Sequence, residues 1–280
     1  FYHKNWDKEK PIYVQTIKIY SKSANNTVNY LICNNKDTLL WIANLGCIEM
    51  HPWYSRVNDF DACIKGLNQK EMPVVDEKKC GLGFTDFIVF DLDPYIYSGF
   101  EQEENGAAAI EPEYSIKGFK AAVDIAFHMK DLFDQLKIRS YIKTSGKTGL
   151  HIYVPIEPST YTYSQTKGFA KIIGTLLLKR YPDKITMQWD TAQRKGKVFF
   201  DYNQNSKGKT IASVFSARPT TLATISMPVR WDKLNDIYPT DFTILNAPEI
   251  INKSTNIDTW KDILNNGQDI IKILQDLDLG

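Results

Sequence analysis

Apolar and polar residues alternate along several short stretches of the chain, as they do in strands that bury one face. The stretches with this alternation, or with an apolar run of strand length, are 12–20, 28–33, 87–91, 138–143, 151–156, 197–202 and 210–215. Turn sequences that contain glycine separate the members of the last two pairs, so we expect each pair to form a hairpin. Hairpins favour an antiparallel sheet.

Four longer stretches carry apolar residues at helical spacing. They are 38–46, 117–136, 166–180 and 259–274. In the second of them Phe119, Val123 and Phe127 fall on one face, and Gly267 is expected to interrupt the last. Strands and helices therefore mix along the chain, which predicts an α+β fold, and residues 95–113 are expected to form a long surface loop.

The composition is that of a globular chain, and its charge places a limit on function. Of the 280 residues, 43% are hydrophobic, and the formal net charge is only +1. A surface that binds nucleic acid would have to be a local basic patch, because the chain has no overall basic excess. No apolar stretch approaches the roughly 20 residues of a membrane span, and no signal peptide opens the sequence at Phe1.

The four cysteines are Cys33, Cys47, Cys63 and Cys80. None forms a C-x-x-C pair, and no histidine stands at zinc spacing from them. We interpret them as reduced thiols, which are typical of cytosolic proteins. The sequence thus favours a cytoplasmic location with no membrane partner.

Two of the apolar stretches end in acidic residues. Asp91 and Asp93 stand two positions apart on one expected strand, so both side chains point to one face with Cα atoms about 6.5–7 Å apart. Asp201 ends the stretch VFFD on a second strand. Three carboxylates repel one another unless cations offset them, and two divalent ions would also attract a triphosphate. Each acid taken alone is equally explained as a solvated strand end.

A polar segment, TSGKTGLH, spans residues 144–151 between two expected strands. Glycines allow a ligand to approach the backbone closely, and free amides together with Ser145 and Lys147 can hold phosphate oxygens. The segment is not a Walker A motif, and by itself a plain hairpin turn explains it. His51 and Arg218 would each be an ordinary surface residue by itself. Beside the other motifs they are candidate site residues, and Arg218 could neutralise phosphate charge.

Taken together and in this order, the motifs resemble one family closely: the polymerase domain of bacterial ligase D and its stand-alone archaeal relatives, within the archaeo-eukaryotic primase superfamily. The matching stretches are IANLGCIEMHPWYSR, FIVFDLDP, KTSGKTGLHIYVPI, KVFFDYNQNSKGKTI and SARPTTLATISMPVRW. They run from about Trp41 to Trp231 and are highly specific as a set, and the opening FYHK resembles the family's segment of two aromatic residues followed by x-Lys. The resemblance implies a primase-polymerase fold, in which mixed or antiparallel sheets form a catalytic cleft flanked by helices. We expect residues 1–280 to make one two-lobed catalytic domain.

The resemblance also implies the roles of individual residues. Asp91, Asp93 and Asp201 would be catalytic and would hold two divalent metal ions, Mn²⁺ or Mg²⁺. The expected nucleotide-binding residues are Tyr2, Lys4, His51, Ser145, Lys147, Gly149, His151, Gln204 and Arg218. One metal would lower the pKa of a primer 3′-hydroxyl, and the other would stabilise the pyrophosphate leaving group.

The implied function is template-dependent nucleotidyl transfer that extends or fills gaps at DNA ends during double-strand break repair by non-homologous end joining. The expected partners are a DNA template-primer or broken DNA ends, nucleoside triphosphates, a DNA ligase and a Ku-type end-binding protein, in nucleoid-associated cytoplasm. Members of the family usually accept ribonucleotides well, work with manganese and can recognise a 5′-phosphate on the downstream strand.

Three departures from the family pattern shape these expectations. The sequence shows no counterpart of the family's lysine-bearing segment upstream of the aromatic pair, so we expect weak recognition of the 5′-phosphate. Lys147 stands one position earlier than the lysine of many members, where Thr148 now is. The loop after Asp93 is longer than the family pattern.

Two other functions stay open from the residues. FDLDP superficially resembles the D-x-D of haloacid-dehalogenase-type phosphatases, but those have Thr or Val four positions after the first Asp, where this chain has Tyr95. The second is a catalytically silent module that binds DNA ends. It is disfavoured because all three carboxylates are present.

Overall fold

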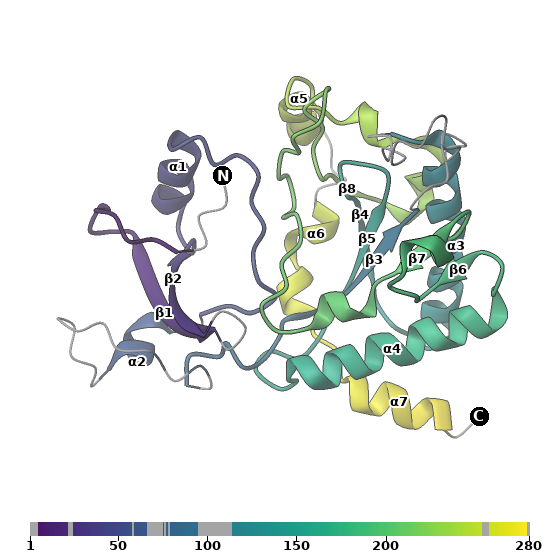
Figure 1. Ribbon diagram of the computed structural model, residues 1–280, viewed down its shortest axis with the longest axis horizontal. Coiled ribbons are helices and arrows are strands. Elements are labelled where there is room, and N and C mark those ends of the chain that lie inside the picture. Colours follow the sequence, from purple (N-terminus) through teal and green to yellow (C-terminus); the bar gives the residue numbers. More distant parts are fainter. Residues whose placement is uncertain are drawn as a thin grey trace. The chain divides into compact units, whose positions relative to one another are not determined.

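The computed structural model describes residues 5–21, 25–57, 59–65, 75, 77, 79–94, 114–253 and 258–278 (Figure 1). The chain divides into two compact units. The first takes Phe1–Ile48 and Ser55–Phe84, and the second takes Glu49–Tyr54 and Thr85–Gly280. His51 therefore belongs to the second unit, although the chain on either side of its segment belongs to the first. The single two-lobed domain stays a prediction.

The first unit contains a two-stranded antiparallel sheet. Strand β1 (Gln15–Ser21) pairs with β2 (Asn26–Ile32) along the whole length of both. Ile17 and Ile19 of β1 are buried, as the alternation of apolar and polar residues predicts. Both strands lie within three residues of the bounds expected from the sequence.

The helices of the first unit are short. Helix α1 (Lys36–Asn44) begins after Asn35, whose side chain accepts a hydrogen bond from the Thr38 amide at 2.8 Å and so caps the helix. After α1 the chain leaves through Gly46 at φ +79°, a conformation that glycine adopts without strain. Helix α2 (Phe60–Ile64) is the other helix that the structure describes in this unit.

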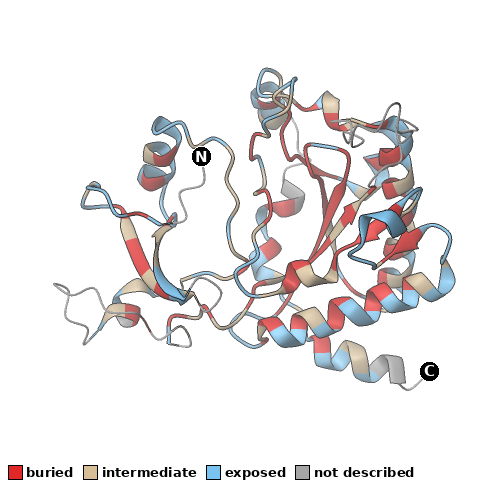
Figure 2. Ribbon diagram, in the orientation of Figure 1, coloured by how far each residue is buried: buried red, intermediate tan, exposed pale blue. Residues whose placement is uncertain are grey.

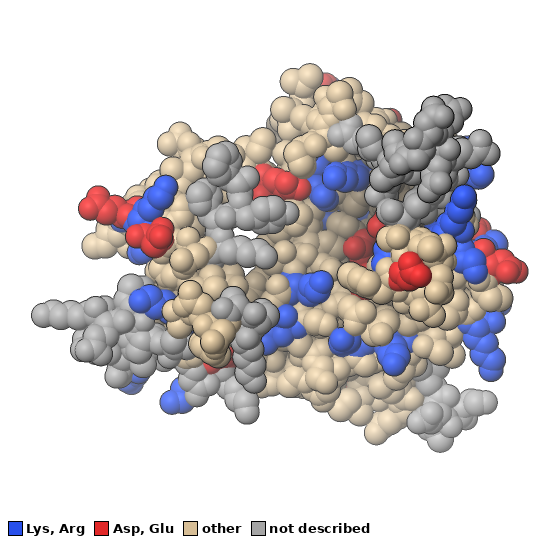
Figure 3. Space-filling view, in the orientation of Figure 1, with Lys and Arg blue, Asp and Glu red and all other residues tan. Residues whose placement is uncertain are grey.

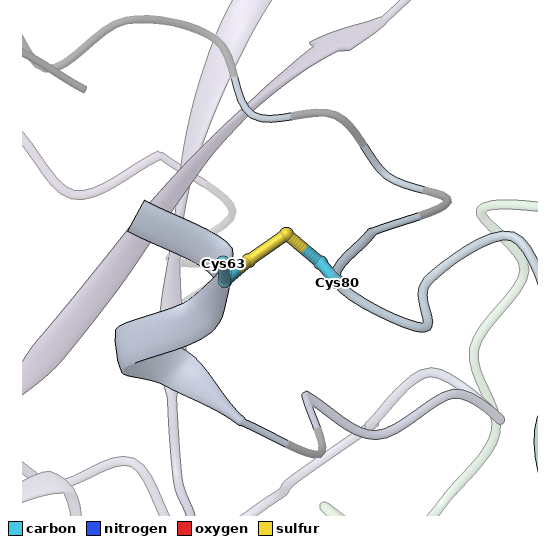
Figure 4. The surroundings of a disulfide bond; sticks show 2 residues. All are labelled: Cys63 and Cys80. Atoms are coloured by element: carbon cyan, nitrogen blue, oxygen red, sulfur yellow. A yellow bond between two sulfur atoms is a disulfide. The ribbon is translucent and has the colours of Figure 1, made fainter. Parts of the chain in front are cut away.

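A disulfide joins Cys63 of α2 to Cys80 (Figure 4). Their Cα atoms lie 4.8 Å apart, inside the usual range for disulfides of about 4.4–6.8 Å. The expectation of four reduced thiols is therefore wrong for this pair, because the fold brings together two cysteines that are 17 positions apart in the sequence. Cys33 and Cys47 remain thiols, as expected.

The second unit contains a six-stranded sheet with the order β6-β7-β3-β5-β4-β8. Its strands are β3 (Phe87–Asp93), β4 (Tyr141–Thr144), β5 (Leu150–Pro155), β6 (Ile185–Thr186), β7 (Val198–Phe200) and β8 (Pro228–Val229). Neighbouring strands are antiparallel except β6 and β7, which are parallel. The sheet is therefore mixed, and the α+β class expected from the sequence is confirmed.

Two long helices of the second unit begin at side chains that cap them. Helix α3 (Ile116–Gln135) follows Ser115, whose hydroxyl accepts a hydrogen bond from a backbone amide of the first turn. Helix α4 (Tyr163–Arg180) begins with a capping box between Thr162 and Gln165. Both helices lie within three residues of the bounds predicted from apolar spacing.

One face of the sheet and these two helices form the main core. Phe90 of β3 packs against Phe133 of α3 and Phe200 of β7, with ring centroids 5.5 Å and 5.6 Å away. Phe169 of α4 is buried in the same cluster. Figure 2 shows the strands of this sheet as largely buried, whereas α4 buries one side and exposes the other. The core thus holds the sheet rigidly from one side.

The other helices that the structure describes in the second unit are short. These are α5 (Ala247–Lys253), α6 (Asp258–Lys261), α7 (Ile270–Asp278) and the 3-10 helices η1 (Thr191–Arg194), η2 (Tyr202–Asn205), η3 (Trp231–Asp236), η4 (Pro239–Asp241) and η6 (Ile263–Asn265). The break between α6 and α7 contains Gly267, where the sequence predicted an interruption. Among the described residues no helix is long and apolar enough to cross a membrane.

The second hairpin predicted from the sequence, between residues 197–202 and 210–215, does not form. Strand β7 lies where the first of its strands was expected, but it pairs with β3 and β6. Residues 210–215 instead run beside the segment that carries His51, where the Ser213 amide donates to the Met50 carbonyl at 2.9 Å. A Gly-containing turn signals a local reversal of the chain, but the distant strand β3 supplied the better partner for β7. The expected loop 95–113 lies outside the described residues.

Candidate active site

Three polar residues form a row across the centre of the sheet. In the register of the strands, Asp91 of β3 lies opposite His151 of β5, and His151 lies opposite Lys143 of β4. Residues directly opposite in antiparallel strands share a face, so all three side chains lie on the face away from the main core. Lys143 and His151 are buried, at 0% and 4% exposure. A lysine and a histidine in such a position need polar partners.

A chain of hydrogen bonds supplies those partners. Lys143 Nζ lies 2.8 Å from His151 Nδ1 and also donates to Ser226 Oγ. Ser226 in turn donates its only hydroxyl proton to the Thr144 carbonyl, at 2.7 Å, so its oxygen accepts from Lys143. With Lys143 as donor to Nδ1, the proton of a neutral His151 resides on Nε2. That nitrogen lies 3.6 Å from Asp91 Oδ1.

Burial dominates the protonation of these two basic groups. It lowers the pKa of Lys143 well below its usual value, and the charge of Arg218 lowers it further while Asp91 opposes the shift. Burial also lowers the pKa of His151 well below its usual value, followed by the charges of Lys143 and Arg218. The lowered pKa favours the neutral form of His151, in which Nδ1 can accept a hydrogen bond from Lys143.

The other two carboxylates stand beside Asp91. Asp93 is on the same strand two positions later and lies opposite Phe199 of β7. Asp201 follows directly after β7, and its amide donates to the Asp91 carbonyl at 3.3 Å. The Asp201 carboxylate also accepts a hydrogen bond from the Asn203 amide at 2.9 Å, which fixes its side chain at the start of η2. Neighbouring strands thus bring together the three acids predicted from the sequence.

The three carboxyl groups resist losing their protons. Burial, followed by the charges of Asp93 and Asp201, raises the pKa of Asp91 to about 8, although Lys143 and Arg218 oppose this. Burial is also the largest cause of the raised pKa of Asp93 and of Asp201. A cluster of this kind has a high affinity for positive charge, because a cation favours the ionised form that the protein alone disfavours.

The donor set suits a hard divalent cation. Carboxylate oxygens are the ligands that Mg²⁺ and Mn²⁺ prefer. When the three acids are ionised, their charges repel one another, and a bound cation would offset that repulsion. Within the described ranges, no three His, Cys, Asp or Glu side chains are already gathered in metal-binding positions. The fit therefore rests on residue type, placement on adjacent strands and electrostatics. The residues that would hold such an ion are Asp91, Asp93 and Asp201.

The loop between β4 and β5 folds back on itself. Ser145 Oγ accepts hydrogen bonds from the amides of Lys147 and Gly149, both at 3.1 Å. The Ser145 hydroxyl proton can still be donated to a ligand. Gly149 could not carry a side chain here, because an added Cβ would lie 2.5 Å from the Leu92 carbonyl oxygen. The loop is therefore pressed against β3 between the two aspartates, and Lys147 at its tip is exposed.

Arg218 ties this loop to the segment that carries His51. Its NH1 donates to the Ser145 carbonyl at 2.7 Å, and its Nε donates to Glu49 Oε1 at 2.9 Å. The same carboxylate oxygen lies 3.0 Å from His51 Nε2. Gly146 makes room for Arg218, since an added Cβ would lie 2.5 Å from Arg218 Cγ. The structure thus groups Arg218, His51 and Ser145, which the sequence named separately.

Gln204 is placed by internal hydrogen bonds. It lies in η2, is buried, and donates from Nε2 to the Tyr54 hydroxyl at 2.8 Å and to the Thr210 carbonyl at 2.6 Å. Its expected closeness to a nucleotide stays a prediction. Tyr2 and Lys4, also expected at the nucleotide, lie outside the described residues.

Sequence reasoning missed three residues of this site: Lys143, Ser226 and Glu49. Glu49 carried a usable signal, since it stands two positions before His51 and so shares a face with it in an extended segment. Lys143 precedes the polar loop, but a lysine is normally expected at the surface. Ser226 could be found only from the fold, which brings it to Lys143 from 83 positions away.

Comparison with known proteins identifies a matching family. The family model described as "LigD, primase-polymerase domain" matches residues 1–260. A bifunctional non-homologous end joining protein LigD of Bacillus subtilis is 28% identical over 87% of this chain and 32% of its own length. A multifunctional non-homologous end joining protein LigD of Mycolicibacterium smegmatis is 27% identical over 84% of this chain and 26% of its own length. The chain thus spans about a third or less of these relatives.

A solved structure shows the same fold. It is the polymerase domain from Mycobacterium tuberculosis Ligase D in complex with DNA, which matches with a TM-score of 0.70. The sequences are 23% identical, and the match covers 96% of this chain and 80% of that one. The primase-polymerase fold expected from the sequence is thereby confirmed. The chain belongs to the family of LigD primase-polymerase domains, the nucleotidyltransferase domains of non-homologous end joining proteins.

Proposed function

We propose that this chain adds nucleotides to a DNA primer strand on a template, and that it extends or fills DNA ends in double-strand break repair. The observation that supports the proposal best is the set of three carboxylates on adjacent strands β3 and β7, beside the buried pair His151 and Lys143. The family assignment favours this function over a phosphatase with Asp91 as nucleophile and over a silent end-binding module.

Asp91, Asp93 and Asp201 would hold two divalent ions, Mn²⁺ or Mg²⁺. When bound, these ions supply activation of the primer hydroxyl and neutralisation of the triphosphate charge. The protein's own contribution is placement: the hydrogen bond from Asp201 to the Asp91 carbonyl and the register of β3 with β7 set where the carboxylates stand. Such placement is the main source of catalysis in phosphoryl transfer.

The triphosphate would lie between these acids and the loop after β4. Ser145 offers its hydroxyl proton, and neutral His151 offers its Nε2 proton toward the side of the site where Asp91 stands. Arg218 carries positive charge and is held by Glu49 and the Ser145 carbonyl, so it is positioned before any ligand arrives. His51, Lys147 and Gly149 complete the proposed contacts.

We also propose the wider setting that the family resemblance implies. The substrates would be broken or gapped DNA ends with nucleoside triphosphates, ribonucleotides included, and the partners a DNA ligase and a Ku-type protein. The site of action would be nucleoid-associated cytoplasm.

The test is primer extension on gapped DNA with Mn²⁺, followed as strand growth and pyrophosphate release with ribo- and deoxynucleotides. Wild-type protein should extend the primer and Asp201→Asn should not, while both bind the template, because contacts to the phosphate backbone dominate that affinity. Asp232→Asn, an exposed aspartate paired with Arg230, is the matched control. Wild-type protein that binds the template but makes neither product would overturn the proposal. A phosphoaspartate on Asp91 with release of phosphate would favour the phosphatase.

Arg218 allows a sharper test of the nucleotide site. Arg218→Ala should raise the KM for nucleotide about tenfold or more, the effect expected from losing one charge-assisted hydrogen bond, and leave duplex affinity nearly unchanged. Arg230→Ala is the matched control, since Arg230 is exposed and paired with Asp232. Loss of DNA affinity with an unaltered KM would show that Arg218 serves the DNA and not the nucleotide.

A further inference from the structure

Trp189 is an exposed tryptophan on a fixed piece of backbone. Its exposure is 62%, although it stands in the short segment between β6 and β7. The buried guanidinium of Arg194 donates to the Gln188 carbonyl at 3.0 Å and to the Trp189 carbonyl at 2.5 Å. Asp190 then caps η1 by accepting from the Ala192 amide at 3.1 Å. The backbone around Trp189 is therefore held by hydrogen bonds while the indole ring meets solvent.

Cations and a second aromatic ring surround the indole. The Phe199 ring packs against it in an edge-to-face arrangement, with centroids 5.9 Å apart and planes at 74°. Arg194 lies 3.5 Å from the Phe199 centroid and 5.3 Å from the Trp189 centroid. Lys209, an exposed lysine, places its Nζ 5.7 Å from the Trp189 centroid. An exposed aromatic ring thus has two positive charges within 6 Å of its centre.

This aromatic and basic patch adjoins the carboxylates. Phe199 is the residue of β7 that lies opposite Asp93, so the two side chains share a face of the sheet. The charge of Arg194 lowers the pKa of both Asp93 and Asp201, against the effect of burial, and Lys209 does the same to Asp201. Figure 3 shows further Lys and Arg side chains on this unit over and beside α4.

We propose that Trp189, with Arg194 and Lys209, is a stacking platform for an unpaired base of the single strand at a DNA end. Single-stranded nucleic acid matches both parts of the patch: each base offers a flat face for stacking, and each phosphate offers a negative charge to a lysine or arginine. A paired duplex does not, because its bases already stack on one another. A single exposed apolar residue is ordinary by itself, so the fixed backbone, the flanking cations and the adjacent carboxylates carry the inference.

The inference rests on the proposed function, since a strand end near the three carboxylates is what that reaction requires. The test compares wild type with Trp189→Ala and Trp189→Phe, using a fluorescently labelled oligothymidylate and a blunt duplex without nucleotide or divalent metal. Trp189→Ala should weaken binding of the single strand by about 5- to 150-fold, the range for loss of one stacked base. Trp189→Phe, which keeps an aromatic face, should retain most of the affinity, and the duplex should bind all three proteins alike.

Two further variants separate stacking from general effects. Leu245→Ala removes another exposed apolar side chain of the same unit, at 88% exposure, and should leave single-strand affinity unchanged. Lys209→Gln should reduce the slope of log affinity against log salt by about 0.7, the value for one phosphate contact on a single strand. Equal loss for single strand and duplex, or equal affinity of wild type and Trp189→Ala, overturns the platform. So does wild-type protein that ignores the oligonucleotide but captures an acidic peptide.

The binding result and the activity result fail separately. Wild type that holds the single strand through Trp189 but adds no nucleotide contradicts the proposed function and leaves the platform standing. If wild type and Trp189→Ala extend primers equally well and bind the single strand with equal affinity, the proposed function is kept and the platform is contradicted. Melting temperatures of all variants exclude unfolding as the cause.

Discussion

The two faces of the six-stranded sheet differ in character although alternate residues of the same strands supply both. On one face Ile88, Phe90 and Leu92 of β3 enter the core beneath α3 and α4. On the other, Asp91 and Asp93 stand beside His151. One residue along the strand thus separates a position that holds the fold together from one that would perform the chemistry, and substitutions at neighbouring positions should have opposite consequences.

The largest expected effect is on the polar face. Asp91→Asn should lower nucleotidyl transfer by about a thousandfold or more, because an amide cannot replace the charge that holds the cations. It should not lower the melting temperature, because burial already disfavours the charged carboxylate of Asp91 in the folded state and a neutral amide avoids that cost. Rates of primer extension and thermal unfolding of the same preparation test this. A marked fall in melting temperature would show that Asp91 is also part of the structural core.

The next effect is on the apolar face, at the adjacent position. Phe90→Ala should reduce the free energy of unfolding by about 3–5 kcal/mol, because it opens a cavity between Phe133 and Phe200. Activity per folded molecule should persist at a temperature where the variant stays folded. Denaturant unfolding gives the energy, and extension at low temperature gives the activity. Inactive but fully folded Phe90→Ala would break the separation between the faces.

A smaller effect is expected from the buried lysine behind His151. Lys143→Met keeps a chain of similar length but removes the donor to Nδ1, so the proton of His151 should redistribute between its two nitrogens. We expect about a 10- to 100-fold loss of extension, the usual cost of removing a residue that orients a functional histidine. Nitrogen-15 NMR of the imidazole reports the tautomer directly. Lys130→Met, which alters an exposed pair with Asp134, is the control, and an unaltered His151 spectrum in Lys143→Met would refute the role.

The last contrast between the faces is the pH dependence of stability in the metal-free protein. Folding raises the pKa of Asp91 from 3.8 to about 8. Below pH 3.8 both folded and unfolded chains hold the proton, whereas between 3.8 and about 8 only the folded chain does. Rising pH therefore favours unfolding across this window. The melting temperature should fall from pH 5 to pH 8 less steeply in Asp91→Asn than in wild type or in the exposed control Asp134→Asn, and parallel slopes would contradict the shift.

Sequence patterns predicted the local parts of this architecture well. The apolar spacing of α3 and α4 and the run before Asp91 depend on residues close in the chain, and their bounds agree with the structure within three residues. The partners of β7 could not be predicted, because β3 and β6 pair with it on its two sides through contacts between residues that are not neighbours in the sequence. The disulfide between Cys63 and Cys80 has the same cause.

The candidate site divides in the same way. The acids at the ends of apolar strands were visible in the sequence because a carboxylate interrupts an apolar pattern. Lys143 was not visible, because nothing in its neighbours says that a lysine is buried, and its partner Ser226 comes from a different strand region. The exposure of Trp189 could not be predicted either, since it depends on how Arg194 holds the backbone.

Gly149 has a consequence for how the two halves of the site move. Its missing side chain lets the loop after β4 rest directly on the backbone of β3, at the residue between Asp91 and Asp93. An added Cβ would lie 2.5 Å from the Leu92 carbonyl oxygen, so the loop has no room to approach the strand more closely at this point. A ligand that pushed the loop inward would therefore press on the strand that carries the aspartates as well, so the position of the proposed phosphate loop and the spacing of the carboxylates depend on each other.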